Sequence, residues 1–370
     1  MKIVTTIARI LVGLLFIFSG FIKANDTLGF SYKLNEYFEI FGTHFLIPIS
    51  TFLAIFICIF EIILGFTLLL GARVKLTLWL LLLMIVFFTF LTFYSAYFNK
   101  VQECGCFGDF LHLTPWTSFG KDLVLLVLII VLFIGKQYIN PVCGPRMENG
   151  LLVLITIGTT AFPIYTYNYL PVFDFRAYAI GKNIPEQTKG TPDELKYFYK
   201  LKDKKTGEIT EVDKWPENWD QKYDFVDSRN EIIKKGVDPK IKDFSISDLN
   251  GADYTQDIIE NPEANFLLIC YDLDKTNKAV FGKINDFASL CKAEGVTFAV
   301  LTSSPKEQVE KFKAETGITM DFYSTDGTVL KTMIRSNPGL MLLKAGTVLD
   351  MWHYHSFPAY TDVKEKYFKK

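Results

Sequence analysis

Five long apolar segments occupy the first 170 residues of this 370-residue chain. Each is close to the length of about 20 mostly apolar residues that a helix needs to cross a bilayer. This part carries 10 Lys/Arg and 8 Asp/Glu, whereas the remaining 200 residues carry 29 and 32. The first 170 residues cannot fold as an ordinary soluble domain, so we expect a helical membrane bundle followed by a soluble region. The segments run approximately over Ile3–Ile22, Phe45–Leu70, Leu76–Phe98, Phe119–Ile139 and Gly150–Leu170.

Basic residues in the short connections predict the orientation of the bundle. Short loops rich in Lys and Arg stay in the cytoplasm. This rule places the N-terminus in the cytoplasm, and after five spans the soluble region lies outside, in a bacterial periplasm bounded by the inner membrane. The basic residues concerned are Lys2, Arg9, Arg73, Lys75, Lys136 and Arg146.

Cys104 and Cys106 form a Cys-Gly-Cys motif in the connection before the fourth apolar segment. Two thiols one residue apart can close only a very small ring, and strained disulfides exchange readily. Gly105 has no Cβ and can take the φ values of a tight turn. We interpret the motif as a redox pair; the alternatives are a static disulfide or two free thiols packed at a helix end. A metal site is not expected, because two thiols with His112 fall short of four ligands.

Arg9 and Glu61 are the clear charges inside long apolar segments. Intramembrane charges are costly and tend to be paired or functional. Their depths differ by about one helical turn, so we predict a salt bridge between them. The functional alternative is a proton or quinone site near Glu61, and a quinone is the one cofactor considered. At the start of the fourth segment, we expect Lys121 and Asp122 to reach toward the membrane surface.

Four motifs mark the membrane part: Arg9-x-x-x-Gly13, Phe18-Ser-Gly20-x-x-Lys23, Glu61-x-x-x-Gly65-x-x-x-x-x-Gly71 and Cys104-Gly-Cys-Phe-Gly-Asp109. With these residues the membrane part resembles the DoxX-like family, and its cysteine loop resembles the MauE branch of that family. The resemblance covers roughly residues 1–140 and implies a four-helix core, to which a fifth span is added. It also implies membrane-bound thiol redox work at Cys104 and Cys106. MauE is linked to maturation of the disulfide-rich small subunit of methylamine dehydrogenase, and DoxD-like relatives pass electrons from thiosulfate to quinone.

The soluble part is predicted to contain a polar β-containing spacer and an α/β domain. A hairpin is expected around Lys205-Thr-Gly207, in a spacer over residues 171–240. Residues 241–370 follow the order β-α-β-α-β-α-β-β, which resembles a thioredoxin fold of the peroxiredoxin/TlpA-like group. The resemblance implies a cis peptide bond at Asn337-Pro338, in the loop that binds a partner backbone. The predicted domains are thus 1–140, 141–170 (the fifth span), 171–240 and 241–370.

The predicted α/β domain departs from that family at its redox site. Where thioredoxin-like enzymes carry Cys-x-x-Cys, the segment Tyr271–Asn277 has no thiol. Cys270 and Cys291 are expected to be buried packing residues, and buried thiols are usually inert. We expect His353 and His355 to lie on the surface.

These observations favour a membrane-anchored thiol–disulfide redox or maturation factor for periplasmic proteins. Cys104 and Cys106 would carry the exchange, and Asn337 and Pro338 would dock the client without chemistry. The alternatives are a non-enzymatic interaction or assembly subunit of an envelope complex, and a subunit of a quinone-linked oxidase. The expected partners are the bilayer and a client protein or envelope complex. Nucleic acid is not expected, because neither part has a basic excess.

Overall fold

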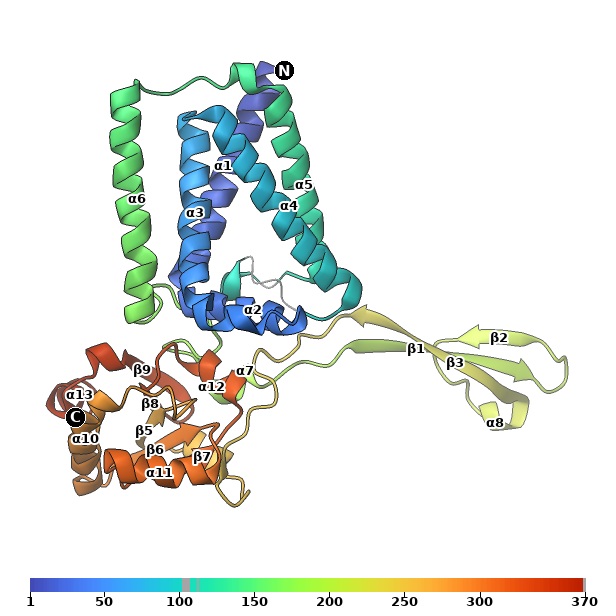
Figure 1. Ribbon diagram of the computed structural model, residues 1–370. Coiled ribbons are helices and arrows are strands. Elements are labelled where there is room, and N and C mark those ends of the chain that lie inside the picture. Colours follow the sequence, from blue (N-terminus) through green and yellow to red (C-terminus); the bar gives the residue numbers. More distant parts are fainter. Residues whose placement is uncertain (102–106, 112, 369–370) are drawn as a thin grey trace.

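The computed structural model describes residues 1–101, 107–111 and 113–368. Cys104, Cys106 and His112 lie outside these residues. The described chain forms a helical bundle, a β-ribbon and a C-terminal α/β region (Figure 1).

Within the described residues, five helices of the bundle are long and apolar enough to cross a membrane, as the sequence predicted. Large apolar side chains such as Ile3, Phe52 and Trp79 are exposed around the bundle, so the five helices fit a multi-pass membrane protein. The helices are α1 (Lys2–Asn25), α3 (Ser50–Leu70), α4 (Val74–Phe98), α5 (Pro115–Ile134) and α6 (Pro145–Asn168). In Figure 1 α1, α3, α4 and α5 are grouped together, and α6 stands beside α3.

Glycines set the distance between α1 and α3. A Cβ added to Gly13 would lie 2.6 Å from the Leu69 side chain, and one added to Gly65 would lie 2.7 Å from the carbonyl oxygen of Gly13. Both positions therefore need glycine for the two backbones to approach this closely. Gly71 ends α3 with a φ of +70°, a conformation that favours glycine at the end of a helix.

Helix α2 (Thr27–Ile40) lies across one end of the bundle, called here the α2 end (Figure 1). Asp26 caps it by accepting a hydrogen bond from the Gly29 N–H at 2.9 Å. The Tyr37 hydroxyl lies 2.9 Å from Ser95 Oγ of α4 and fastens α2 to the bundle. The helical spacing of Phe30, Leu34, Tyr37, Phe38 and Phe41 in the sequence predicts a helix over Leu28–Phe41, and the structure confirms it. The short helix η1 (His44–Ile49) joins α2 to α3.

The β-ribbon projects sideways from the level between the bundle and the C-terminal region (Figure 1). Its antiparallel order is β2-β1-β3, and Gly207 has a φ of +77° in the predicted hairpin connection. The sequence pattern did not predict β3, because every residue after Tyr223 is exposed and the strand has no regular alternation of apolar and polar residues. The strands are β1 (Glu194–Asp203), β2 (Ile209–Val212) and β3 (Tyr223–Lys234), with α8 (Trp219–Lys222) before the last.

The C-terminal sheet has six strands in the order β4-β7-β6-β5-β8-β9. Strands β5, β6 and β7 are parallel, and β8 is antiparallel to β5. The predicted order β-α-β-α-β-α-β-β is confirmed from β5 to β9, with β4 and α9 before it and α13 after it, and the Asn337–Pro338 peptide bond is cis. The strands are β4 (Ser247–Asp248), β5 (Ala264–Ile269), β6 (Thr297–Thr302), β7 (Asp321–Ser324), β8 (Gly339–Lys344) and β9 (Thr347–His353).

Helices cover both faces of this sheet because its central strands are apolar on both sides. Phe266 and Leu268 of β5 point to one buried cluster, and Leu267 and Ile269 to the other. The first cluster is covered by α10 (Phe281–Ala293), α11 (Lys306–Thr316) and α13 (Tyr360–Tyr367), and the second by α7 (Ile184–Gln187), α9 (Thr255–Ile259) and α12 (Gly327–Met333).

The prediction of a surface position for His353 is wrong. His353 is 2% exposed at the end of β9, where its Nδ1 accepts a hydrogen bond from the His355 N–H at 3.2 Å. Its ring also lies against Tyr354. The strand pattern alone could not show that the chain turns here and covers the ring. Burial, and secondarily the neighbouring His355, lowers the pKa of His353 to about 4.

We expect acid to destabilise the protein through His353. Its pKa rises to about 6.5 on unfolding, so between these pH values the unfolded state binds more protons. The contribution of neutral His353 to the free energy of unfolding is fully present above about pH 6.5 and is lost as the pH falls to about 4. The total loss is up to about 3 kcal/mol. Unfolding midpoints of the purified protein between pH 7.5 and 4 should fall less steeply for His353→Gln than for the wild type. The exposed His44 provides the control, because His44→Gln should leave the slope unchanged. Equal slopes for His353→Gln and the wild type would contradict the assignment.

Candidate functional site at the α2 end of the bundle

The connection that carries Cys104 and Cys106 is anchored on both sides at the α2 end. Val101 before it is fully buried, and Phe107 after it is 7% exposed. The Phe107 ring lies 5.8 Å from that of Phe18 on α1. The two cysteines themselves lie outside the described residues, and the groups around their anchors form the candidate site.

The predicted salt bridge between Arg9 and Glu61 is wrong. Arg9 instead donates from Nε to the Leu68 carbonyl at 2.9 Å and from Nη2 to the Leu69 carbonyl at 2.7 Å. These carbonyls belong to the last turn of α3, where backbone oxygens have no partner within the helix and a positive charge is favoured. Arg9 therefore binds the end of a neighbouring helix rather than a carboxylate.

Glu61 pairs with Lys23, which lies two residues before the end of α1. Lys23 Nζ is 2.7 Å and 2.8 Å from the two carboxylate oxygens, and the side chains are only 3% and 2% exposed. Lys23 also donates to Ser19 Oγ, one turn earlier, at 2.7 Å. Lys23 belongs to one of the sequence motifs, but its pairing with Glu61 was not predicted. The spacing of Ser19 and Lys23, four residues apart on one helical face, was the signal available.

Asp122 forms a second buried ion pair, on α5. It is 1% exposed; Lys121 Nζ lies 2.9 Å from its Oδ1, and Thr92 of α4 donates to its Oδ2 at 3.0 Å. The expectation that Asp122 reaches the membrane surface is therefore wrong. Residues Ser118, Asp122, Leu125, Ile129 and Leu132 form the buried face of α5, so the carboxylate belongs to the inward stripe of this helix.

The two ion pairs line one small cavity, called here the polar chamber. Its volume is about 20 Å³, which is room for about one water molecule. Nearby, Ser118 is fully buried, and its Oγ has no hydrogen-bond partner among the described residues. The chamber is lined by Leu15, Phe16, Ser19, Lys23, Glu61, Ile85, Phe88, Phe107, Lys121, Asp122 and Leu125.

A quinone ring does not fit the chamber in this arrangement. Lys23 and Lys121 could donate hydrogen bonds to quinone oxygens, but the cavity is far smaller than the about 300 Å³ of ordinary ligand pockets. The geometry therefore gives no support to a quinone at this position.

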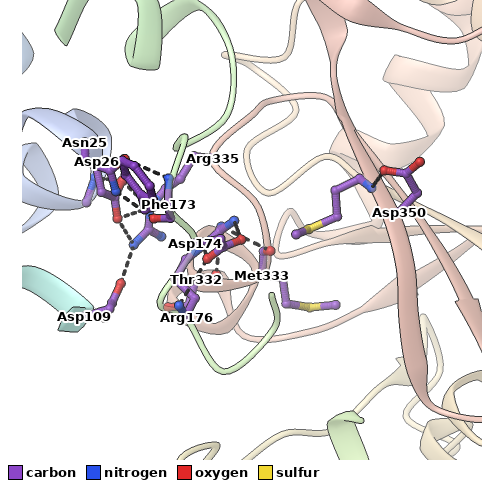
Figure 2. Close-up of polar contacts among 12 residues, drawn as sticks. Asn25, Asp26, Asp109, Phe173, Asp174, Arg176, Thr332, Met333, Arg335 and Asp350 are labelled. Atoms are coloured by element: carbon purple, nitrogen blue, oxygen red, sulfur yellow. Dashed lines mark hydrogen bonds and ion pairs between the residues drawn. The ribbon is translucent and has the colours of Figure 1, made fainter. Parts of the chain in front are cut away.

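Arg335 of the C-terminal region reaches Asp26 and Asp109 at the α2 end of the bundle (Figure 2). Its Nε lies 2.9 Å from both carboxylate oxygens of Asp26, and its Nη2 lies 2.8 Å from Asp26 Oδ2. The same Nη2 is 3.4 Å from Asp109, three residues after Cys106. The Arg335 and Asp26 side chains are 7% and 17% exposed. We call Arg335, Asp26 and Asp109 the Arg335 latch.

The ion pair with Arg335 changes the pKa of the Asp26 carboxyl. Burial alone would raise the pKa of the Asp26 carboxyl, but the charge and hydrogen bonds of Arg335 outweigh burial and lower the pKa below its ordinary value. The Asp26 carboxylate is therefore stably ionised at neutral pH, and the ion pair persists in mild acid. It is lost only as the pH falls through this lowered pKa.

Further polar contacts surround the latch. The side-chain amide of Asn25 donates to the Phe173 carbonyl at 2.7 Å and accepts from the Phe173 N–H at 2.9 Å. Arg176 pairs with Asp174 and donates to the Thr332 carbonyl at 3.2 Å (Figure 2). The chain that leaves α6 is thus fastened both to the end of α1 and to the C-terminal region.

The predicted partner-binding residues Asn337 and Pro338 follow Arg335 closely. Asn337 is buried; its amide donates to the Asp272 carbonyl at 2.8 Å and accepts from Thr276 Oγ1 at 2.9 Å. The hydroxyl of Tyr271 lies 3.1 Å from that of Tyr32 on α2. The edge that carries the cis-proline loop and Tyr271 is thus the edge that contacts the bundle.

The cysteines of the C-terminal region take no part in this contact. Cys270 and Cys291 are fully buried and free, as predicted. Burial raises the pKa of Cys291 to about 12, and it raises the pKa of Cys270 as well. Neither thiol ionises at neutral pH, so neither is a competent nucleophile there.

Comparison with known proteins gives one finding, and it concerns the bundle. No curated protein and no solved structure matches this chain. Residues 1–135 match the model of a protein family described as methylamine utilisation protein MauE. The part of the chain that carries α1 to α5, with the polar chamber and two of the three residues of the latch, is therefore similar to MauE.

Proposed function

We propose that this chain is a membrane-anchored thiol–disulfide redox or maturation factor for periplasmic proteins. Cys104 and Cys106 exchange with a client disulfide, and the C-terminal region acts as a thioredoxin-like docking domain without chemistry of its own. The observation that carries the proposal is the Arg335 latch. It joins the cis-proline edge of the C-terminal region to Asp109, three residues from Cys106, within the MauE-matched part.

The proposed location is the bacterial inner membrane, with the N-terminus in the cytoplasm. The α2 end and the C-terminal domain then share the periplasm, which permits disulfides. The description of the matched family points to a client that serves methylamine utilisation. A tethered docking domain would raise the effective concentration of such a client beside the membrane thiols.

The exchange needs no reagent beyond the client. A thiolate of the pair attacks one sulfur of the client disulfide, which gives a mixed disulfide and releases a client thiolate that takes up a proton. The second cysteine, after losing its proton, attacks its partner's sulfur in the mixed disulfide. This step closes the Cys104–Cys106 disulfide and frees the other client thiol. The same steps in reverse oxidise the client.

Replacing both cysteines by serine is expected to abolish the activity. Thiol trapping in intact cells should find the wild-type pair in reduced and oxidised forms. The client disulfide pattern should change in Cys104→Ser/Cys106→Ser, because the nucleophile and the resolving thiol are both lost. Single variants should accumulate a mixed disulfide that identifies the client. Cys143→Ser serves as the control and should behave as the wild type. Unchanged client disulfides in the double variant would refute the proposal.

A non-enzymatic assembly subunit is the second candidate, favoured by the β-ribbon. Apolar side chains such as Ile209, Ile232 and Ile233 are exposed on it, and exposed apolar surface often marks an interface. This function requires a stable partner that co-purifies equally with the wild type and with Cys106→Ser. A partner captured only through the cysteines supports the redox function instead.

A further inference from the structure

The β-ribbon has two faces of different chemistry. Residues that pair across antiparallel strands point to the same side of a sheet, so the register assigns each side chain to a face. On one face, alternate residues of β1 pair with uncharged residues of β2 and β3. We call this surface the aromatic face, and it is formed chiefly by Leu195, Tyr197, Tyr199, Leu201, Phe225 and Ile232.

Two tryptophans extend the aromatic face. The Trp215 ring centre lies 4.5 Å from that of Tyr199, 6.0 Å from that of Phe225 and 4.2 Å from that of Trp219. Even with these contacts, Phe225 is 49% and Ile232 is 56% exposed. Apolar surface gathered on one side of an element and left exposed marks a place where another apolar phase makes contact.

The opposite face of the ribbon is charged, and its charges are paired with one another. Arg229 forms ion pairs with Glu211 and Glu231, and its guanidinium lies 4.5 Å from the centre of the Phe198 ring. These residues pair across the strands with Phe198, Lys200 and other members of the same face. The charged face is therefore suited to water, and the aromatic face is the one that needs a partner.

A tight neck sets the direction in which the ribbon leaves the rest of the chain. Thr191 and Val237 form an antiparallel bridge at its base. A Cβ added to Gly236 would lie 2.0 Å from the Thr191 carbonyl oxygen, and one added to Gly190 would lie 2.8 Å from the Pro239 side chain. Both glycines are thus needed for the two chains to approach this closely.

The neck is fastened to the C-terminal region. The Gln187 carbonyl of α7 accepts hydrogen bonds from the N–H groups of Lys240 and Ile241 at 3.0 and 3.1 Å. Helix α7 is itself held through Ile184, which belongs to a buried cluster of that region. The Arg335 latch joins the C-terminal region to the α2 end. A chain of contacts therefore fixes the position of the ribbon relative to the bundle.

The ribbon extends at the level of the membrane surface. In Figure 1 it runs sideways from beside the α2 end, across the direction of the membrane helices. The ends of these helices at the α2 end mark one surface of the bilayer that they fit. A structure that extends sideways at this level runs along the lipid headgroups. The bilayer is therefore the apolar phase within reach of the aromatic face.

We propose that the aromatic face of the β-ribbon binds the interfacial layer of the bilayer that the bundle crosses. Tyr and Trp combine an apolar ring with one polar atom, and they concentrate at the headgroup level of membranes. From Leu195 to Leu201 the aromatic face has no charged residue, so its attachment needs no anionic lipid. The ribbon thus acts as a lateral membrane anchor for the C-terminal region, a role beyond the proposed function.

The test is photo-cross-linking of the full-length chain in its native membrane. Ile232 and Ile209 are a matched pair, because they are 56% and 55% exposed but lie on opposite faces. Phospholipid adducts should be severalfold more abundant for Ile232→benzoylphenylalanine than for Ile209→benzoylphenylalanine. Equal lipid yields at the two positions would overturn the inference. A protein adduct in place of lipid at Ile232 would also overturn it and would favour a protein interface.

Tryptophan fluorescence provides a second measurement, in nanodiscs of phosphatidylcholine brominated near the headgroup. With Trp79, Trp116 and Trp352 replaced by Phe, the fluorescence that remains comes from the ribbon, and bromine should quench it equally at low and high salt.

The same matched pair gives the control for the quenching. Ile232→Asp should lose most of it and Ile209→Asp should retain it. Absence of quenching, or its loss in high salt, would overturn the inference. Neither measurement involves thiol exchange, so its failure leaves the proposed function unaffected.

Discussion

Glu61→Gln is expected to destabilise the bundle by about 3–5 kcal/mol, because it leaves the Lys23 ammonium buried without its counter-charge. Ser19 and the ring of Phe88 cannot replace a carboxylate that binds the ammonium through both oxygens. The apparent melting temperature of the purified protein in detergent should fall accordingly. Lys23→Met should have a comparable effect, since it leaves the Glu61 carboxylate unpaired.

The matched double variant separates the ion pair from its individual charges. Replacing both partners by apolar residues of similar size, as in Lys23→Met/Glu61→Leu, should recover most of the lost stability, because no buried charge is left unpaired. The exposed pair Lys33–Glu36 on α2 is the control, and Glu36→Gln should leave the melting temperature unchanged. A Glu61→Gln protein as stable as the wild type would show that Lys23 is not held by Glu61.

Arg335→Gln is expected to release the C-terminal region from the bundle. The substitution leaves Asp26 largely buried without its cation and weakens docking by about 3 kcal/mol, which raises the undocked population roughly 100-fold. Hydrogen–deuterium exchange should then become faster in α2 and in residues 331–338. Exchange in β5 and β6 should not change, since their hydrogen bonds lie within the sheet.

The acidic residues of the latch predict a graded series. Asp26→Asn should resemble Arg335→Gln, whereas Asp109→Asn should have a smaller effect, because Asp109 is more distant and 30% exposed. Arg229 of the β-ribbon, whose ion pairs are exposed, is the control, and Arg229→Gln should leave exchange in α2 unchanged. Unaltered exchange in α2 for both Arg335→Gln and Asp26→Asn would show that the latch does not hold the two parts together.

The sequence predicted the elements well where periodicity and length decide them. The five apolar helices, the hairpin at Gly207 and the α/β order after residue 241 followed from local pattern. Strand β3 was missed because its side chains are exposed on both faces and give no periodic signal. The cis bond at Pro338 came from a family resemblance, since no local pattern specifies it.

The candidate site was less predictable because it depends on which helices meet. Arg9 and Glu61 had compatible depths, but the end of α3 offered Arg9 carbonyl oxygens, and Lys23 was closer to Glu61. Lys23 stands near a helix end, where lysines commonly extend to the membrane surface, and its four-residue spacing from Ser19 was a weak local signal for a buried partner. The contact of Arg335 with Asp26 joins residues 309 positions apart, and no short-range rule anticipates such a partner.

The hydrogen bonds between the Asn25 side chain and the Phe173 backbone affect the order in which the protein assembles during synthesis. The ribosome completes the first helix long before it reaches Phe173, which comes 148 residues later. Until then the Asn25 amide lacks its partner Phe173, and the surface to which the C-terminal region binds is incomplete. Membrane insertion of the last helix thus precedes attachment of that domain, so biogenesis proceeds in a fixed order.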